Sequence, residues 1–347
     1  MTLAVRYTAA RTLDTAAVLS ARPGPGEVEL APAFVGICGT DLHIFHGDMD
    51  ARVHTPAVLG HEMSGRVVRV GPGVEGWEAG DAVTVMPLRW DGTCPACRAG
   101  HQHICQQLDF IGIDSPGAMQ QRWTVPASTL IRLPESLSLD RAALVEPTAV
   151  AVHDVGRAEV AEGEKVVVVG GGPVGILIAL VARAAGAKVR VVELSAHRRL
   201  LAGELGLTAW DPMAADVPGL VGEWTGGAGA DVAFEVSGAA GGVDTAVDVL
   251  GVRGRLCLVA IHPRPREVNL HRFFWRELTL VGARLYDRSD FERAVALVAD
   301  GTILAERLIS KVVPLTQAPA AFEALEGGGD VMKILVDCTD DTQGAAV

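Results

Sequence analysis

The stretch that decides the fold runs from residue 164 to residue 194 and reads EKVVVVGGGPVGILIALVARAAGAKVRVVEL. Its four consecutive valines predict a buried strand, because strands covered on both faces form continuous apolar runs. Glycines then mark a turn, a longer apolar segment predicts a helix, and a second valine-rich run predicts another strand. This order is a β-α-β unit, and such units build parallel sheets.

The chain on the C-terminal side of this unit continues the alternation. Further strands are predicted at 230–236, 254–261 and 278–285, with segments able to form helices between them. The predicted fold class is therefore α/β, and residues 150–286 are expected to form a doubly wound parallel sheet.

The rest of the chain has a different sequence pattern. Residues 1–149 contain short β segments, at 27–37, 60–71 and 80–87, broken by glycine and proline, which predicts a compact β-rich domain. Residues 287–347 are expected to contain an amphipathic helix and then a last strand at 332–338. The helix is predicted to place four apolar residues on one face: Phe291, Ala294, Val295 and Val298.

Length and composition exclude several classes of protein. A chain of 347 residues is too long for one ordinary core and predicts two domains. No apolar run reaches the length of a membrane span, and the N-terminus lacks the pattern of a signal peptide, so we expect a cytoplasmic protein. A net charge of −12 argues against a nucleic-acid partner. Six cysteines in a reducing compartment do not predict disulfides, and three of them lie within twelve residues, which indicates metal.

The glycine turn at 170–175 predicts a dinucleotide site. Gly170, Gly172 and Gly175 form G-x-G-x-x-G between a strand and a helix, where the backbone and the helix N-terminus can receive a pyrophosphate. The alternative is a plain strand–turn–helix. Glu193 ends the second strand 18 residues after Gly175, where a carboxylate accepts hydrogen bonds from ribose hydroxyls and repels a 2′-phosphate. This favours NAD over NADP. Arg198 and Arg199 lie close by and weaken that preference.

A second group of residues predicts a catalytic metal site. The segment GICGTDLH supplies Cys38, and GHE supplies His61 and Glu62. Cysteine, histidine and carboxylate are zinc ligands, and an open catalytic site uses three of them plus water. Each residue has another interpretation: Cys38 as a small core residue, His61 as a satisfied buried histidine, and Glu62 as a solvated charge. Their joint occurrence in glycine-bounded turns, beside a nucleotide fold, favours the metal.

These motifs together resemble those of the zinc-dependent medium-chain alcohol dehydrogenases, in the branch of polyol, butanediol and threonine dehydrogenases. The likeness covers roughly residues 5–338 and includes GICGTDLHIFHG, GHEMSGRVVRVGPGV, VEP, the GGGPVG turn and EVSG at 235–238. It implies a GroES-like catalytic domain, a Rossmann domain, a return of the chain to the first domain over 287–347, and a homodimer or homotetramer. Pro173, Val174 and Ser237 would join the glycines, Glu193 and Arg198 in binding the cofactor.

The resemblance also implies a mechanism and roles for residues. Cys38, His61 and Glu62 would hold the zinc, and Glu146 of VEP lies where this branch has a ligand or nearly one. A Lewis-acid metal would lower the pKa of the alcohol hydroxyl, and hydride would pass from carbon to the nicotinamide. Thr40 would take the substrate proton, and His43 would relay it toward solvent. His46 and His54 lie near and stay unassigned.

The loop DGTCPACRAGHQHIC, residues 91–105, predicts a structural zinc site. The family pattern C-x2-C-x2-C-x7-C places Cys94, Cys97 and Cys105 in its last three positions and Asp91 in its first. A carboxylate oxygen is an accepted zinc ligand and carries the same charge as a thiolate. Two alternatives stay open: a histidine, His101 or His103, as fourth ligand, or a loop without metal.

The substrate is predicted only as a class. A glutamate ligand in place of a second cysteine is similar to the polyol and butanediol branch, so a secondary alcohol with a neighbouring hydroxyl, converted to its ketone, is preferred. Threonine is the alternative within the family, and Leu88, three residues before Asp91, weighs against it. Leu88, Trp90, Phe110 and Trp123 line the pocket or belong to the core. An alternative of another class is a zinc-free quinone reductase or structural nucleotide-binding protein, which would lack Cys38, His61 and Glu62.

Overall fold

The computed structural model describes residues 1–262, 264–326 and 330–339. It divides into two compact units. Unit 1 comprises 1–146, 287–301 and 305–347, and unit 2 comprises 147–286 and 302–304. Within the predicted return of the chain over 287–347, positions 327–329 and 340–347 lie outside the described residues.

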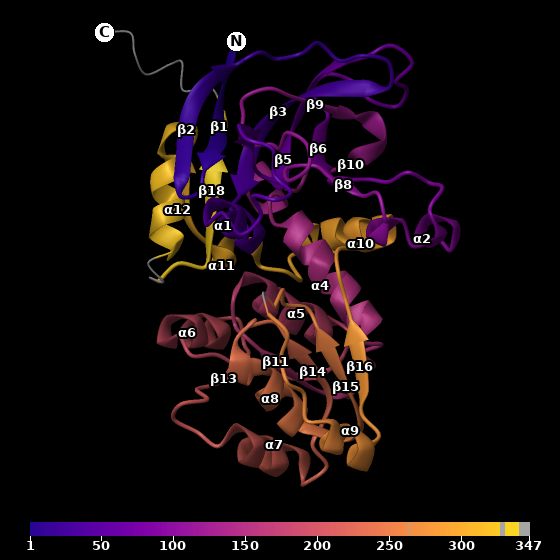
Figure 1. Ribbon diagram of the computed structural model, residues 1–347, viewed down its shortest axis with the longest axis vertical. Helices are drawn as coiled ribbons and strands as arrows, with labels where there is room; N and C mark the ends of the chain where they lie inside the picture. The colour runs from indigo at the N-terminus through magenta and orange to yellow at the C-terminus, as the bar shows by residue number, and fades with distance from the viewer. Residues whose placement is uncertain (263, 327–329, 340–347) are drawn as a thin grey trace. The chain divides into compact units, whose positions relative to one another are not determined.

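Unit 2 is built on a six-stranded sheet with the order β13-β12-β11-β14-β15-β16, and every pairing in it is parallel (Figure 1). The strands are β11 (Lys165–Val169), β12 (Lys188–Val192), β13 (Thr208–Trp210), β14 (Ala230–Glu235), β15 (Leu250–Leu258) and β16 (Thr279–Gly282). The helices between them are α5 (Pro173–Ala184), α6 (Ala196–Glu204), α7 (Val217–Thr225), α8 (Ala240–Asp248) and α9 (Leu270–Arg276). The α/β fold class predicted from the first β-α-β unit is confirmed.

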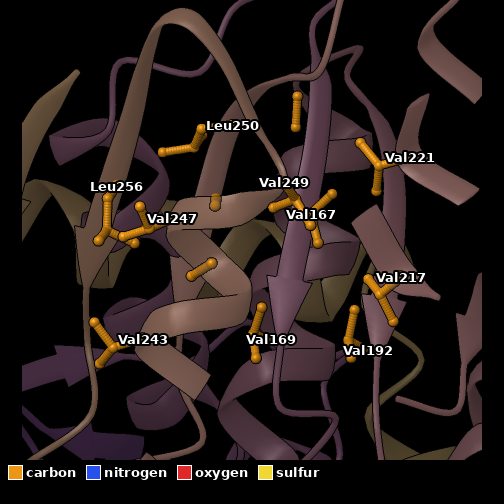
Figure 2. Packing of buried hydrophobic residues seen from close by; sticks show 13 residues of the cluster. Val167, Val169, Val192, Val217, Val221, Val243, Val247, Val249, Leu250 and Leu256 are labelled. Atoms are coloured by element: carbon orange, nitrogen blue, oxygen red, sulfur yellow. The ribbon is translucent and has the colours of Figure 1, made fainter. Parts of the chain in front are cut away.

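The four valines of β11 lie in a sheet that helices cover on both faces. Val167 and Val169 belong to a buried cluster with residues of α7 and α8, among them Val221 and Val247 (Figure 2). Val168 points to the other face, where its side chain lies 3.5 Å from the position that a Cβ on Gly175 of α5 would take. Alternate residues of one strand thus bury against helices on opposite faces, which requires an unbroken apolar run.

Unit 1 is β-rich. Its largest sheet has the order β10-β6-β5-β3-β18-β17 with β9 also on β3, and its two smaller sheets are β2-β1-β4 and β7-β8 (Figure 1). The strands are β1 (Thr2–Ala9), β2 (Thr12–Val18), β3 (Glu27–Gly36), β4 (Ala57–Val58), β5 (Glu62–Val70), β6 (Ala82–Val85), β7 (Leu88–Arg89), β8 (Asp109–Phe110), β9 (Trp123–Pro126), β10 (Leu130–Arg132), β17 (Ile309–Pro314) and β18 (Lys333–Asp337). The last strand of the chain therefore lies beside one of the first.

Unit 1 contains several helices, most of them short, and one helix crosses the division between the units. They are α1 (Gly39–Phe45), α2 (Pro95–Arg98), α3 (Leu139–Ala142), α10 (Arg288–Ala299), α11 (Ala305–Leu308) and α12 (Ala318–Glu326), with the 3₁₀ turns η1 (Gln102–Ile104), η2 (Ala127–Thr129) and η3 (Leu315–Gln317); the helix at the division is α4 (Val145–Arg157). The predicted face of α10 differs at one position: Leu297 is buried with Phe291, Ala294 and Val298, whereas Val295 is half-buried. Within the described ranges, no helix is both long and apolar enough to cross a membrane.

Candidate metal and cofactor sites

The predicted catalytic ligands meet at the start of two elements of unit 1. Cys38 precedes α1, and His61 and Glu62 stand where β5 begins. One ligand atom from each of the three lies within 4.8 Å of the others, and His61 and Glu62 are buried. Glu146, in the first turn of α4, is also buried and acts electrostatically on His61, but it is not part of this close group.

A buried carboxylate that the sequence did not single out supports the histidine. Asp41, in the first turn of α1, accepts the backbone N–H of Cys38 at 2.9 Å, and its Oδ1 lies 3.7 Å from Nδ1 of His61. Those two atoms are buried and, among the described residues, lack a hydrogen bond. The ring of Phe110 packs edge-on against His61, with centroids 5.1 Å apart. An orphaned polar pair beside a confined imidazole fits a site that a cation completes.

Lys333 is a second residue of this site that sequence reasoning missed. The residue is 3% exposed, and its ammonium donates to Oε1 and Oε2 of Glu62, at 2.8 and 2.6 Å. The only signal was one lysine in the apolar run MKILVDC. Burial lowers the pKa of Lys333, but the charges of Glu62 and Cys38 raise it above its usual value. The negative charge around this ammonium therefore outweighs the cost of its burial.

The loop at 91–105 brings together the four residues of the predicted structural zinc site. Asp91, Cys94, Cys97 and Cys105 place one ligand atom each within 4.8 Å of the others. Backbone N–H groups of Cys97 and Gln106 point at the Sγ of Cys94, at 3.4 and 3.5 Å, and they lower the pKa of that thiol. Donors aimed at sulfur stabilise thiolates, which are the form that binds zinc.

The rival histidines of this loop lie elsewhere. His103 is buried, and its Nδ1 lies 2.9 Å from Oδ1 of Asp287, the residue before α10. His101 is exposed and stands before η1. Asp91 also has a task that needs no metal, since its Oδ1 accepts the N–H groups of Thr93 and Cys94 at 2.8 and 3.0 Å. These bonds lower its pKa and keep it ionised.

The predicted dinucleotide site lies at the carboxyl ends of β11, β12 and β14 in unit 2. Gly170 has a φ of +108°, and a Cβ there would lie 2.9 Å from the backbone nitrogen of Ser237. A Cβ on Gly175 would lie 1.9 Å from the carbonyl oxygen of Gly170. The glycines therefore allow three backbone segments to approach each other before α5 begins at Pro173, with Val174 next to it.

Glu193 is held in place by the backbone. Its Oε2 accepts the N–H of Gly171 and its Oε1 accepts the N–H of Ser195, both at 2.7 Å. Arg199 pairs with Asp211 at 2.9 Å and also donates to the carbonyl of Glu193, so its guanidinium is engaged. Arg198 remains beside Glu193, with Nη1 4.0 Å from Oε2.

The remaining predicted residues differ in burial and in their neighbours. Thr40 and His43 lie three residues apart on α1 and so share a side of the helix, and His43 Nδ1 is 3.1 Å from Oδ2 of Asp48. His46 and His54 are exposed. Of the four residues assigned to pocket or core, Leu88, Phe110 and Trp123 are buried, whereas Trp90 is exposed.

Comparisons with known proteins place the chain in a family. The model of the alcohol dehydrogenase GroES-like domain matches residues 24–135, and that of the zinc-binding dehydrogenases matches residues 173–300. The 2-dehydro-3-deoxy-L-galactonate 5-dehydrogenase of Pseudoalteromonas atlantica is 49% identical over 316 residues, which cover 91% of this chain and 93% of that protein.

Solved structures agree with these matches. The 2R,3R-butanediol dehydrogenase of Bacillus subtilis superposes with a TM-score of 0.90 at 32% identity, over 97% of this chain and 99% of that one. A zinc-binding dehydrogenase of Sinorhizobium meliloti, bound to NADP, superposes with a TM-score of 0.92 at 32% identity and the same coverage. The resemblance seen in the sequence is thereby confirmed: the chain belongs to the zinc-type medium-chain dehydrogenases and is an oxidoreductase of the alcohol dehydrogenase kind.

Proposed function

We propose that this protein is a zinc- and NAD-dependent dehydrogenase of a polyhydroxylated sugar acid, oxidising one secondary hydroxyl that has a hydroxyl neighbour to the ketone. The observation that carries this proposal is the 49% identity to a sugar-acid 5-dehydrogenase over nearly the whole chain. Such an acid contains the secondary alcohol that the ligand set favours. The butanediol dehydrogenase likeness supports the same type of hydroxyl.

The residues near Cys38 would divide the work. Cys38, His61 and Glu62, with Glu146 close by, would hold a zinc ion, which supplies Lewis acidity toward the substrate hydroxyl. Thr40 would receive the hydroxyl proton. His43 would carry it to solvent, because its side chain is 41% exposed and its Nδ1 is beside Asp48. Asp41 would hold His61 in orientation through Nδ1. Asp91, Cys94, Cys97 and Cys105 would bind a second, structural zinc.

Unit 2 would bind the dinucleotide at its glycine turn. Glu193, fixed by two backbone N–H groups, presents its carboxylate beside Gly171, where the adenosine ribose is expected. Arg199 is engaged by Asp211, which supports NAD over NADP. The NADP-bound relative and the position of Arg198 make this preference a question for measurement.

We also propose a homodimer or homotetramer in the cytoplasm. The strand β16 is an edge of its sheet, and on α9, the helix before it in the chain, the apolar side chains of Phe274 and Trp275 are 76% and 68% exposed. An unpaired edge beside exposed apolar surface favours association with a second copy. Light scattering of the purified protein measures the assembly.

One screen tests substrate and cofactor together. Zinc-loaded protein is incubated with NAD or NADP and with 2-dehydro-3-deoxy sugar acids, polyols, vicinal diols and threonine. The sugar acids should have the highest kcat/KM, with about 100-fold preference over threonine, as expected where polar groups must match. NAD should be preferred. Turnover of threonine above all other substrates would replace the proposal with a threonine dehydrogenase, and a preference for NADP would assign Arg198 to the 2′-phosphate.

A further inference from the structure

Lys333 begins β18, is followed there by three apolar residues and is almost completely buried. A buried ammonium is costly unless each of its protons meets an acceptor. The three donors of Lys333 meet three acceptors: Oε1 and Oε2 of Glu62 and, at 3.1 Å, the carbonyl oxygen of Ile37. This lysine is thus fully satisfied inside unit 1, and two of its three bonds go to one carboxylate.

The sheet register brings these groups together. On β3, Gly36 pairs with Glu62 of β5 on one side and with Leu335 of β18 on the other. Gly36 has no side chain, and a Cβ there would lie 2.2 Å from Oε2 of Glu62. The carboxylate of Glu62 therefore extends over Gly36 toward the ammonium of Lys333. Three strands, one of them from the far end of the chain, build this pair.

The same carboxylate belongs to the metal-binding group. An oxygen of Glu62 lies within 4.8 Å of the ligand atoms of Cys38 and His61, although both of its oxygens accept from Lys333. A carboxylate has about four lone-pair positions, and each one engaged by an ammonium is a poorer donor to a metal. Lys333 and a metal ion therefore compete for Glu62.

We propose that Lys333 is a positioning residue of the catalytic site, which weakens Glu62 as a metal ligand so that this carboxylate does not close the site to the substrate hydroxyl. The proposal rests on the proposed zinc-dependent function. Under this proposal Cys38, His61 and Glu146 supply most of the affinity for the metal. The contribution of Glu62 depends on how strongly Lys333 holds its carboxylate.

The test is a double-mutant cycle of Lys333→Met and Glu62→Gln, read by cobalt(II) at the catalytic site of the full-length protein. Cobalt affinity comes from chelator competition, and ligand number comes from the visible absorption spectrum. Lys333→Met should tighten cobalt binding by about tenfold, change the spectrum and lower kcat, because Glu62 becomes a full ligand. In the Glu62→Gln background the same substitution should change cobalt affinity less than about threefold. Lys311→Met, an exposed lysine on neighbouring β17, is the matched control and should change nothing.

Three outcomes separate the possibilities. Equal tightening with and without Glu62 would mean that Lys333 acts only as a distant charge, and the proposal would be wrong. If Lys333→Met does not fold, Glu62→Gln alone decides, because the proposal expects it to weaken cobalt by less than about tenfold, and a loss of about 100-fold would overturn it. Failure of the parent protein to bind cobalt at this site would instead overturn the proposed function.

Discussion

The two metal-binding groups of unit 1 differ in how the chain assembles them. The first group, Asp91, Cys94, Cys97 and Cys105, lies within fifteen residues. Local hydrogen bonds, such as the one from the N–H of Cys94 to Asp91, fix its geometry. Cys38, His61 and Glu62 come together because β3 and β5 pair in one sheet, and β18 adds Lys333 from the other end of the chain. A local site can be lost while the fold is kept. A site built by a sheet depends on the fold, and it contains supporting residues that the spacing of ligands in the sequence does not reveal.

The largest expected effect separates the two groups by function. Cys38→Ala should lower kcat by about 10³-fold or more, because Lewis-acid stabilisation of several kcal/mol is lost. Binding of NAD, measured by fluorescence titration, should be unchanged, since the glycine turn lies in unit 2. Cys257→Ala, a buried thiol of β15, serves as control and should keep most of the activity. Parental turnover by Cys38→Ala would exclude metal chemistry at this group.

The second prediction concerns the local group. Metal analysis of the parent should give two zincs per chain, and Asp91→Ala should give one, with the catalytic zinc kept. The loop stiffness that the zinc supplies would be lost, so the melting temperature should fall by about 3 °C or more. Asp91→Cys, which supplies a thiolate in place of the carboxylate, should keep both zincs. One zinc in the parent, with Cys94, Cys97 and Cys105 all open to a thiol reagent, would contradict the structural site.

The smallest effect tests the rival ligand. His103 bonds to Asp287 rather than joining the cysteines, so His103→Gln should leave two zincs per chain. Losing this bond should cost about 1 kcal/mol of stability, measured by urea unfolding. Loss of one zinc in His103→Gln, with both zincs kept in Asp91→Ala, would reverse the assignment of the fourth ligand.

The sequence predicted what depends on neighbours along the chain. The valine run of β11, the glycine turn before α5 and the spacing of Cys94, Cys97 and Cys105 each carry their own geometry, and the structure places those residues in one strand, one turn and one loop. Lys333, Asp41 and the edge-on contact of Phe110 with His61 were not predicted. Those contacts arise from sheet pairing and from loops distant in sequence. Periodic patterns in the sequence carry no information about such contacts.

Because Gly36 has no side chain, it constrains how this protein can evolve. The space above Gly36 is filled by the carboxylate of Glu62, and the charge of that carboxylate is matched by Lys333. A mutation at any one of these positions leaves a clash, an unmatched buried anion or an unmatched buried cation. We therefore expect residues 36, 62 and 333 to vary as a linked triplet among descendants of this chain, although nearly three hundred positions separate the first from the last.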